Sequence, residues 1–130
     1  MKTDELENKL NKGLDYVIDQ LFHGNTIEGL KKGRVWFGLE QVKEWNSKFG
    51  FQFQIYSNDH FIDNKPHFHI VKKSEGIDCR LFFDGNIFDC KGESSLDKKT
   101  REAILYFLSD IAIQTLLKEF WNKKNPSLSI

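Results

Sequence analysis

The sequence lacks an excess of charge of either sign, and this already narrows the classes of function. Its 130 residues include 19 Lys and Arg against 19 Asp and Glu, so the net charge at pH 7 is zero. Proteins that wrap nucleic acid or adhere to acidic membranes carry a basic surplus. The balance therefore excludes a basic nucleic-acid wrapper and a polybasic membrane binder, although a small local basic patch is compatible with it.

Long apolar runs and an export signal are also missing. No stretch approaches the roughly 18 consecutive apolar residues that a membrane span needs. The first residues, MKTDE, lead into a charged amphipathic stretch, without the apolar segment and small-residue cleavage site of a signal peptide. We therefore expect a cytoplasmic protein that makes no membrane contact.

Cysteine and proline are scarce, with two residues of each type. In a reducing cytoplasm the two cysteines are expected to be thiols rather than a disulfide, and no C-x-x-C element indicates a zinc site. The sequence has no repeats, low-complexity tracts or linker-like segments. A chain of this length then predicts a single domain over residues 1–130.

Hydrophobic spacing predicts helices at both ends of the chain. Apolar residues recur at helical spacing between residues 6 and 22, and a short second helix is indicated by Leu39, Val42 and Trp45. Residues 1–48 are therefore expected to form an N-terminal helical extension. A long C-terminal helix is predicted to start near Ser94 or Ser95 and to end at Asn125.

Four strands are predicted between these helical regions, at residues 51–56, 67–71, 77–83 and 86–90. Asp84-Gly85 separates the last two strands and is a signal for a two-residue hairpin turn. The predicted class is α+β: a four-stranded antiparallel meander covered on one face by the long C-terminal helix. This sheet-plus-helix core spans residues 50–123.

Counting outward from the turns assigns the strand residues to two faces. A two-residue turn at Asp84-Gly85 pairs Cys79 with Cys90, and a four-residue turn at residues 73–76 pairs Ile70 with Cys79. Cys79 and Cys90 would then occupy a widely spaced, hydrogen-bonded position, which again favours two thiols. The register predicts an apolar core face made of Phe68, Ile70, Cys79, Leu81, Phe83, Phe88 and Cys90.

The opposite face collects polar side chains from all four strands. His69 is predicted to lie opposite Arg80, and Arg80 opposite Asp89. Such a row of ionisable groups exceeds what solvation of a sheet requires and indicates a site. The predicted members are Gln52, Gln54, Tyr56, His67, His69, Arg80, Phe82 and Asp89.

The pair His67 and His69 admits three interpretations. Alternation places both side chains on one face, about 6–7 Å apart along the strand. They could ligate a divalent metal such as zinc, with His60, Asp59, Asp78 or Asp89 as a third ligand. They could instead act as general base and acid beside Arg80 in a metal-independent phosphodiesterase.

The third interpretation is a half-exposed strand whose histidines simply face water. Arg80 and Asp89 would then form an ordinary cross-strand ion pair, worth well below about 1 kcal/mol if exposed. As a functional set, we predict His67, His69 and Arg80 as catalytic residues and Tyr56 and Asp89 as binding residues. The predicted metal ligands are His67, His69 and His60.

Residues 53–72 resemble the core of a family of small bacterial proteins, the domain of unknown function numbered forty-one sixty. The shared residues are Ile55-Tyr56, Asp59-His60 and Lys65-Pro66-His67-Phe68-His69-Ile70. The family pattern resembles I-x-I-x-x-x-D-H-x-P-P-H-F-H-V, followed by a meander and a helix with a late Trp, which Trp121 matches. The resemblance covers roughly residues 50–123.

This chain departs from the family pattern in the loop after His60, which is roughly two to three residues longer, and at Lys65, which replaces the first Pro. Members of the family are often encoded beside antitoxin-like proteins. The resemblance therefore implies a toxin–antitoxin or defence-associated context, but no established chemistry.

Three hypotheses follow. The first is a cytosolic interaction module that binds an antitoxin-like protein partner, or a second copy of itself, through the polar face or the N-terminal helix. The second is the phosphodiesterase acting on RNA, which the neutral charge does not favour. The third is the metal-binding protein or hydrolase.

Overall fold

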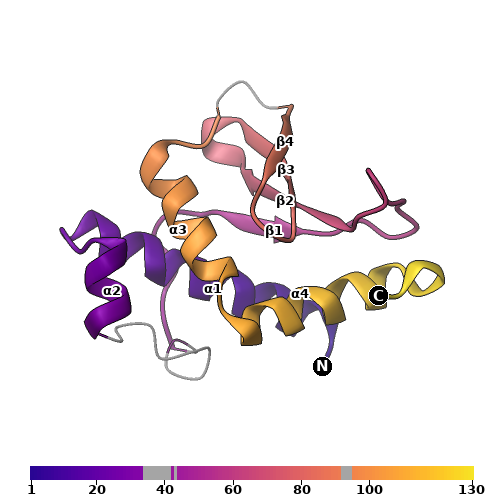
Figure 1. The fold of residues 1–130 in the computed structure, drawn as a ribbon, viewed down its shortest axis with the longest axis horizontal. Coiled ribbons are helices and arrows are strands. Elements are labelled where there is room, and N and C mark those ends of the chain that lie inside the picture. The colour runs from indigo at the N-terminus through magenta and orange to yellow at the C-terminus, as the bar shows by residue number, and fades with distance from the viewer. Residues whose placement is uncertain (34–41, 43, 92–94) are drawn as a thin grey trace.

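The computed structural model describes residues 1–33, 42, 44–91 and 95–130. It is an α+β fold in which a four-stranded antiparallel sheet packs against helices from both ends of the chain (Figure 1). The elements in chain order are α1 (Thr3–Phe22), α2 (Ile27–Gly33), β1 (Gln52–Gln54), β2 (His67–Lys72), η2 (Lys73–Glu75), β3 (Ile77–Phe82), β4 (Ile87–Cys90), α3 (Lys98–Leu108), α4 (Ile111–Lys124) and η3 (Pro126–Leu128). The predicted fold class is confirmed.

The sheet is a meander with the strand order β1-β2-β3-β4. The predicted register between β2 and β3 is confirmed, since His69 pairs with Arg80 and Ile70 with Cys79. Apolar side chains on one face pack beneath α1, α3 and α4 in a single core, which contains Phe53, Phe68, Ile70, Cys79 and Leu81 from the sheet. The other face carries the two histidines.

The hairpin between β3 and β4 differs from the prediction at its turn. Phe82 rather than Phe83 flanks the turn, and its backbone N–H donates to the carbonyl of Asn86 at 3.0 Å. Gly85 closes this longer turn at φ +92, and a Cβ there would lie 2.6 Å from Leu105 Cδ2. The left-handed conformation favours glycine at this position, and any larger residue would also require the Leu105 side chain of α3 to shift.

A β-bulge between Arg80 and Leu81 absorbs the extra turn residue. Arg80 still pairs with Asp89, as predicted, but Leu81 pairs with Ile87 instead of Phe88. The prediction that Phe88 lies on the core face is therefore wrong. Its ring stacks on Phe82 on the polar face, with centroids 4.4 Å apart.

The expectation of two free thiols is also wrong, because Cys79 and Cys90 form a disulfide. The longer turn shifts the hydrogen-bonded pairs by one position, so the N–H of Lys91 donates to the carbonyl of Asp78 at 2.8 Å. Cys79 and Cys90 then form a non-hydrogen-bonded pair, with Cα atoms only 4.0 Å apart. This narrow spacing brings the two sulfurs together.

The C-terminal helix is divided in two, whereas the sequence predicts one long helix. Asp97 caps α3 by accepting a hydrogen bond from the N–H of Thr100, so the helix begins later than Ser95. Asp110 is the N-cap of α4, and its side chain accepts a hydrogen bond from the N–H of Ala112. The break lets two shorter helices bury Phe107 and Trp121 against the sheet and α1.

The N-terminal helix belongs to the core rather than to an appended extension. Its predicted apolar stripe is buried, and its last residue, Phe22, is exposed. The stripe consists of Leu6, Leu10, Leu14, Val17, Ile18 and Leu21. The short α2 is not among the predicted elements, while the predicted helix around Leu39 lies largely outside the described residues.

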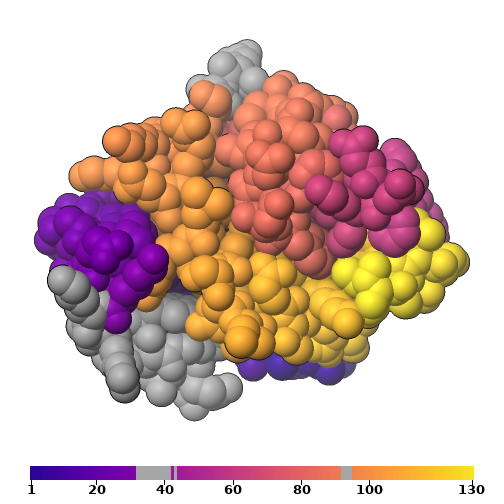
Figure 2. Space-filling view, viewed as in Figure 1, coloured from indigo at the N-terminus to yellow at the C-terminus, as the bar shows by residue number. Residues whose placement is uncertain are grey.

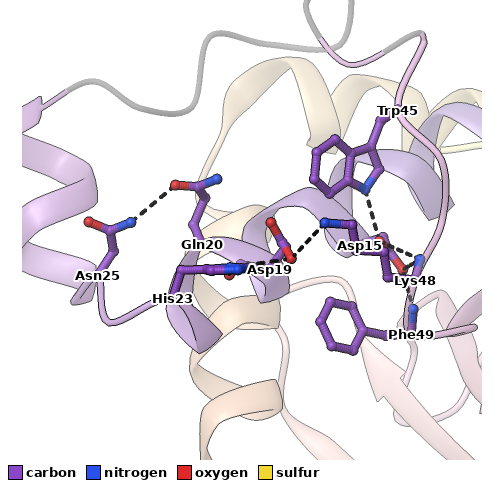
Figure 3. Close-up of polar contacts among 8 residues, drawn as sticks. All are labelled: Asp15, Asp19, Gln20, His23, Asn25, Trp45, Lys48 and Phe49. Carbon is purple, nitrogen blue, oxygen red and sulfur yellow. Dashed lines mark hydrogen bonds and ion pairs between the residues drawn. The ribbon is translucent and has the colours of Figure 1, made fainter.

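Polar side chains of α1 accept hydrogen bonds from the segment that leads into β1. Asp15 accepts hydrogen bonds from Trp45 Nε1 at 2.8 Å and from the backbone N–H groups of Lys48 and Phe49 at 3.0 and 2.9 Å (Figure 3). Asn11 accepts from the N–H of Phe53 at 2.7 Å. These contacts satisfy backbone donors that have no strand partner and fix the edge of the sheet.

No helix among the described residues has the length and apolar character that crossing a bilayer requires.

Candidate functional site

The structure brings the predicted polar residues of β2, β3 and β4 together on the face opposite the core. We call this surface the polar face. His67 and His69 lie on it with ring centroids 6.0 Å apart, and Arg80 sits directly across from His69. Contrary to a half-exposed strand, both histidines are nearly covered, with 2% and 4% of their surface accessible.

His67 lies in the more enclosed part, which we call the closed half of the polar face. Its Nε2 is 3.1 Å from Asp59 Oδ2 in the loop between β1 and β2. The rings of Trp121 and Phe88 lie 5.7 and 5.8 Å from its own, measured between centroids. Aromatic rings and a carboxylate therefore surround this imidazole.

The end of α4 fixes the loop that supplies Asp59. Asn125, which is itself buried, accepts a hydrogen bond from the N–H of Asp59 at 2.6 Å and donates to the carbonyl of Tyr56 at 3.0 Å. Phe61 stacks on Trp121, with centroids 5.7 Å apart. In Figure 2 the magenta loop residues accordingly meet the yellow C-terminal residues on the surface.

Burial controls the protonation of His67. Removal from water lowers the pKa of this imidazole below its ordinary value of 6.5, and the positive charge of Arg80 also lowers it, while Asp59 opposes the shift. Because a carboxylate only accepts hydrogen bonds, the contact with Asp59 favours a proton on Nε2. Nδ1 is buried and has no hydrogen-bond partner among the described residues.

His69 lies in the second part of the face, which we call the open half. Its Nδ1 donates a hydrogen bond to Asp78 Oδ1 at 3.1 Å, and its ring centroid is 4.4 Å from that of Tyr56. Unlike the partners of His67, Asp78 and Tyr56 reach solvent, with exposed fractions of 34% for the Asp78 side chain and 49% for Tyr56. His69 therefore contacts two side chains that are exposed to solvent.

A groove of about 900 Å³ opens beside the His69–Asp78 pair. Its walls come from the end of β1, from the β2–β3 turn and from the residue after β4. The lining residues are Gln54, Tyr56, Val71, Lys73, Ser74, Glu75, Gly76, Ile77, Asp78 and Lys91. Two predicted polar-face residues, Gln54 and Tyr56, thus border a concave surface that the sequence did not reveal.

Arg80 has neighbours in both halves, since it lies opposite His69 of the open half and over Phe88 of the closed half. Its Nη2 contacts Asp89 Oδ2, which confirms the predicted cross-strand pair, and its guanidinium carbon lies 5.1 Å from the centroid of Phe88. The Nε of Arg80 is buried and has no hydrogen-bond partner among the described residues. The guanidinium is thus engaged by a carboxylate and by an aromatic ring.

The residues of the predicted metal site do not come together as ligands. His60 is largely exposed and its ring centroid is 6.5 Å from that of His67. Each histidine instead contacts an aspartate: His60 and His67 contact Asp59, and His69 contacts Asp78. Within the described ranges, no group of three or more His, Cys, Asp or Glu side chains is arranged to hold a metal ion.

Sequence reasoning missed Asn125 as a residue that shapes the site. The sequence indicates it only as a helix end, and its partners Tyr56 and Asp59 are 69 and 66 residues away. No local pattern signals such a contact. Asp78, by contrast, has the same strand parity as Arg80, so the register could have placed it beside His69.

Comparisons with known proteins add no relatives. No protein-family model, curated protein or solved structure matches the chain. The resemblance of residues 50–123 to the domain of unknown function numbered forty-one sixty therefore stays a prediction.

Proposed function

We propose that the protein is a small interaction module that binds a protein partner through the open half of its polar face. The observation that carries this proposal is the groove bordered by Tyr56, whose half-exposed ring packs on His69. Tyrosine supplies a large contact area at low entropic cost and is enriched at interfaces. The hydrogen bond to Asp78 fixes the imidazole of His69, on which the Tyr56 ring packs. This surface is therefore preorganised for recognition.

The buried state of the histidines favours binding over catalysis. A general base or acid must reach the proton that it transfers, within hydrogen-bond distance or through one water molecule. His67 and His69 are covered and each contacts an aspartate, while Arg80 contacts Asp89. Each of these three side chains therefore has a carboxylate partner within the structure.

A metal-independent phosphodiesterase is the second candidate, and one observation favours it. His67 contacts Asp59 through Nε2 and keeps Nδ1 without a described partner, on the same face as Arg80. A carboxylate behind an imidazole is the arrangement that orients a general base. This chemistry requires the loop containing Asp59 to move, since it closes over His67.

A metal-dependent function has less support. Among the described residues, the three predicted ligands His60, His67 and His69 do not converge, so we derive no step through a metal ion.

The identity of the partner is proposed from the family resemblance alone. An antitoxin-like protein encoded nearby is the partner that this resemblance implies, in a toxin–antitoxin or defence context. A homodimer is the competing arrangement.

Site-specific crosslinking tests the proposed function. A photoreactive phenylalanine analogue replaces Tyr56 in one variant and exposed Lys118, on α4, in a control, and both are irradiated in lysate of the source organism. We expect one protein to be captured from position 56 and not from position 118, with capture suppressed by excess unlabelled protein. Equal capture at both positions would contradict the proposal, and RNA cleavage lost in His67→Ala would support the second candidate.

A further inference from the structure

Two lysines line the groove of the open half without an ion-pair partner among the described residues, although the chain as a whole is neutral. Its two carboxylates are engaged: Asp78 with His69 at 3.1 Å and Glu75 with Lys72 at 3.0 Å. Its two lysines, Lys73 and Lys91, are exposed. Neither lysine forms an ion pair with any residue that the structure describes.

The two lysines come from different elements and are held at the groove by backbone contacts. Lys73 starts η2, the turn that joins β2 to β3, and its carbonyl accepts a hydrogen bond from the N–H of Gly76 at 3.2 Å. Lys91 follows β4, and its N–H donates to the carbonyl of Asp78 at 2.8 Å. The adjacent Cys79–Cys90 disulfide ties β3 to β4 at this end of the sheet. The backbone positions of both cations are therefore fixed.

We propose that the groove binds an acidic segment of a protein partner, whose carboxylates pair with Lys73 and Lys91 while an apolar or aromatic side chain packs on Tyr56. The inference rests on the proposed function and names the chemical class of its partner. Charges at the rim of an interface mainly select the partner and steer its approach. The exposed ring of Tyr56 supplies contact area in the same groove.

The same groove is a poor match for nucleic acid. A strand of RNA or DNA presents a negative phosphate at each nucleotide, and affinity depends on neutralising several of them. Here two carboxylates, Asp78 and Glu75, line the groove together with only two lysines, so the groove offers few cations to a continuous phosphate backbone. A polypeptide can place carboxylates only where the cations are, and neutral groups elsewhere.

Selection from a displayed library of random 12-residue peptides tests the partner class directly, because the library samples acidic, basic and neutral segments alike. The full chain serves as the target. We expect selected peptides to be enriched in Asp and Glu, with an apolar or aromatic residue among them. Enrichment in Lys and Arg, or no enrichment over the starting library, would overturn the proposal.

Charge reversal then locates the binding site. The double variant Lys73→Glu/Lys91→Glu should bind a selected acidic peptide about tenfold more weakly than the wild type, which corresponds to about 1.4 kcal/mol. It should also gain affinity for a peptide in which Lys replaces each acidic residue. The matched control is Lys118→Glu/Lys123→Glu, because these exposed lysines line a separate groove on α4. An equal loss in the control would overturn the assignment to this groove.

Two further results separate this inference from the proposed function. Nucleic acid would be the occupant if oligouridylate bound more tightly than the acidic peptides and if this binding were lost in Lys73→Glu/Lys91→Glu. A protein captured at position 56 whose binding is unchanged in that double variant would leave the interaction module standing and overturn the acidic segment. Retained melting temperature in both double variants shows that each result reflects binding rather than unfolding.

Discussion

The closed and open halves of the polar face are built on two histidines of one strand, two residues apart, yet they differ in what surrounds them. His67 is enclosed by Asp59, Trp121 and Phe88, and its pKa is lowered by burial. His69 is covered by Tyr56 and bonded to Asp78, both of which reach solvent beside the groove. His67 is enclosed by its neighbours, whereas His69 lies beneath side chains that are exposed at the groove.

This difference originates in the length of β1. The strand ends at Gln54, opposite His69, so His67 has no β1 residue across from it. The chain leaves the sheet there and returns as the loop that carries Asp59, which the end of α4 holds in place. An H-x-H alternation alone thus does not distinguish an enclosed histidine from one that lies beside an exposed groove.

The largest effect is expected from Asn125→Ala, which breaks the closed half. The substitution leaves the carbonyl of Tyr56 and the N–H of Asp59 without their partner. At about 2 kcal/mol for each unsatisfied group, the free energy of unfolding should fall by about 4 kcal/mol. Urea denaturation measures this change.

The matched control for this change is Asn122→Ala. Asn122 also makes two backbone hydrogen bonds, to Ile130, but in an exposed part of the C-terminus. Water can replace those bonds, so the loss should stay below about 1 kcal/mol. Similar losses in both variants would show that Asn125 does not specifically clamp the loop.

Reduction of the Cys79–Cys90 disulfide should produce the next largest effect, and it acts on the open half. The bond closes a short loop, with a sequence separation of 11 residues, for which the chain-entropy relation gives about 2.8 kcal/mol. We expect a dithiol reductant to lower the free energy of unfolding by this amount. Cys79→Ala/Cys90→Ala should be insensitive to the reductant, and a wild type that does not respond would contradict the bond.

Strand parity predicted most of the sheet correctly because a one-residue slip would move every side chain to the wrong face. Two assignments were wrong: Phe88 was placed on the core face, and Cys79 and Cys90 were expected to be thiols. Both errors have the same origin. The turn before β4 is one residue longer than Asp84-Gly85 implies, and the bulge restores Arg80 opposite Asp89. The longer turn and the bulge together keep Arg80 opposite Asp89, but they change which residue pairs of β3 and β4 are hydrogen-bonded.

The candidate site was only partly predictable for a related reason. His67, His69, Arg80 and Asp89 share a face because of local alternation, which the sequence displays. The enclosure of His67 depends on Asn125 and Trp121, which are distant in the chain. The groove depends on where β1 ends and on how the β2–β3 turn folds, and neither follows from residue spacing.

The smallest effect is expected in the pH dependence of stability, and it sharpens the contrast between the halves. The folded state disfavours protonation of His67, whose pKa lies below 6.5, whereas the unfolded chain takes up the proton near 6.5. The unfolded state therefore binds more protons as the pH falls through this window. Stability should be complete above 6.5 and decrease below it, by at most about 1.4 kcal/mol per pH unit.

His67→Gln isolates this contribution, because glutamine has no titrating group in this range. The variant should be less stable than the wild type at pH 7.5, and the gap between the two should narrow as the pH falls toward 5. His60→Gln is the control, since His60 is largely exposed in the same loop, and it should change the profile less than His67→Gln does. Parallel profiles for His67→Gln and the wild type would show that His67 is not held neutral by its enclosure, and the distinction between the two halves would lose its electrostatic basis.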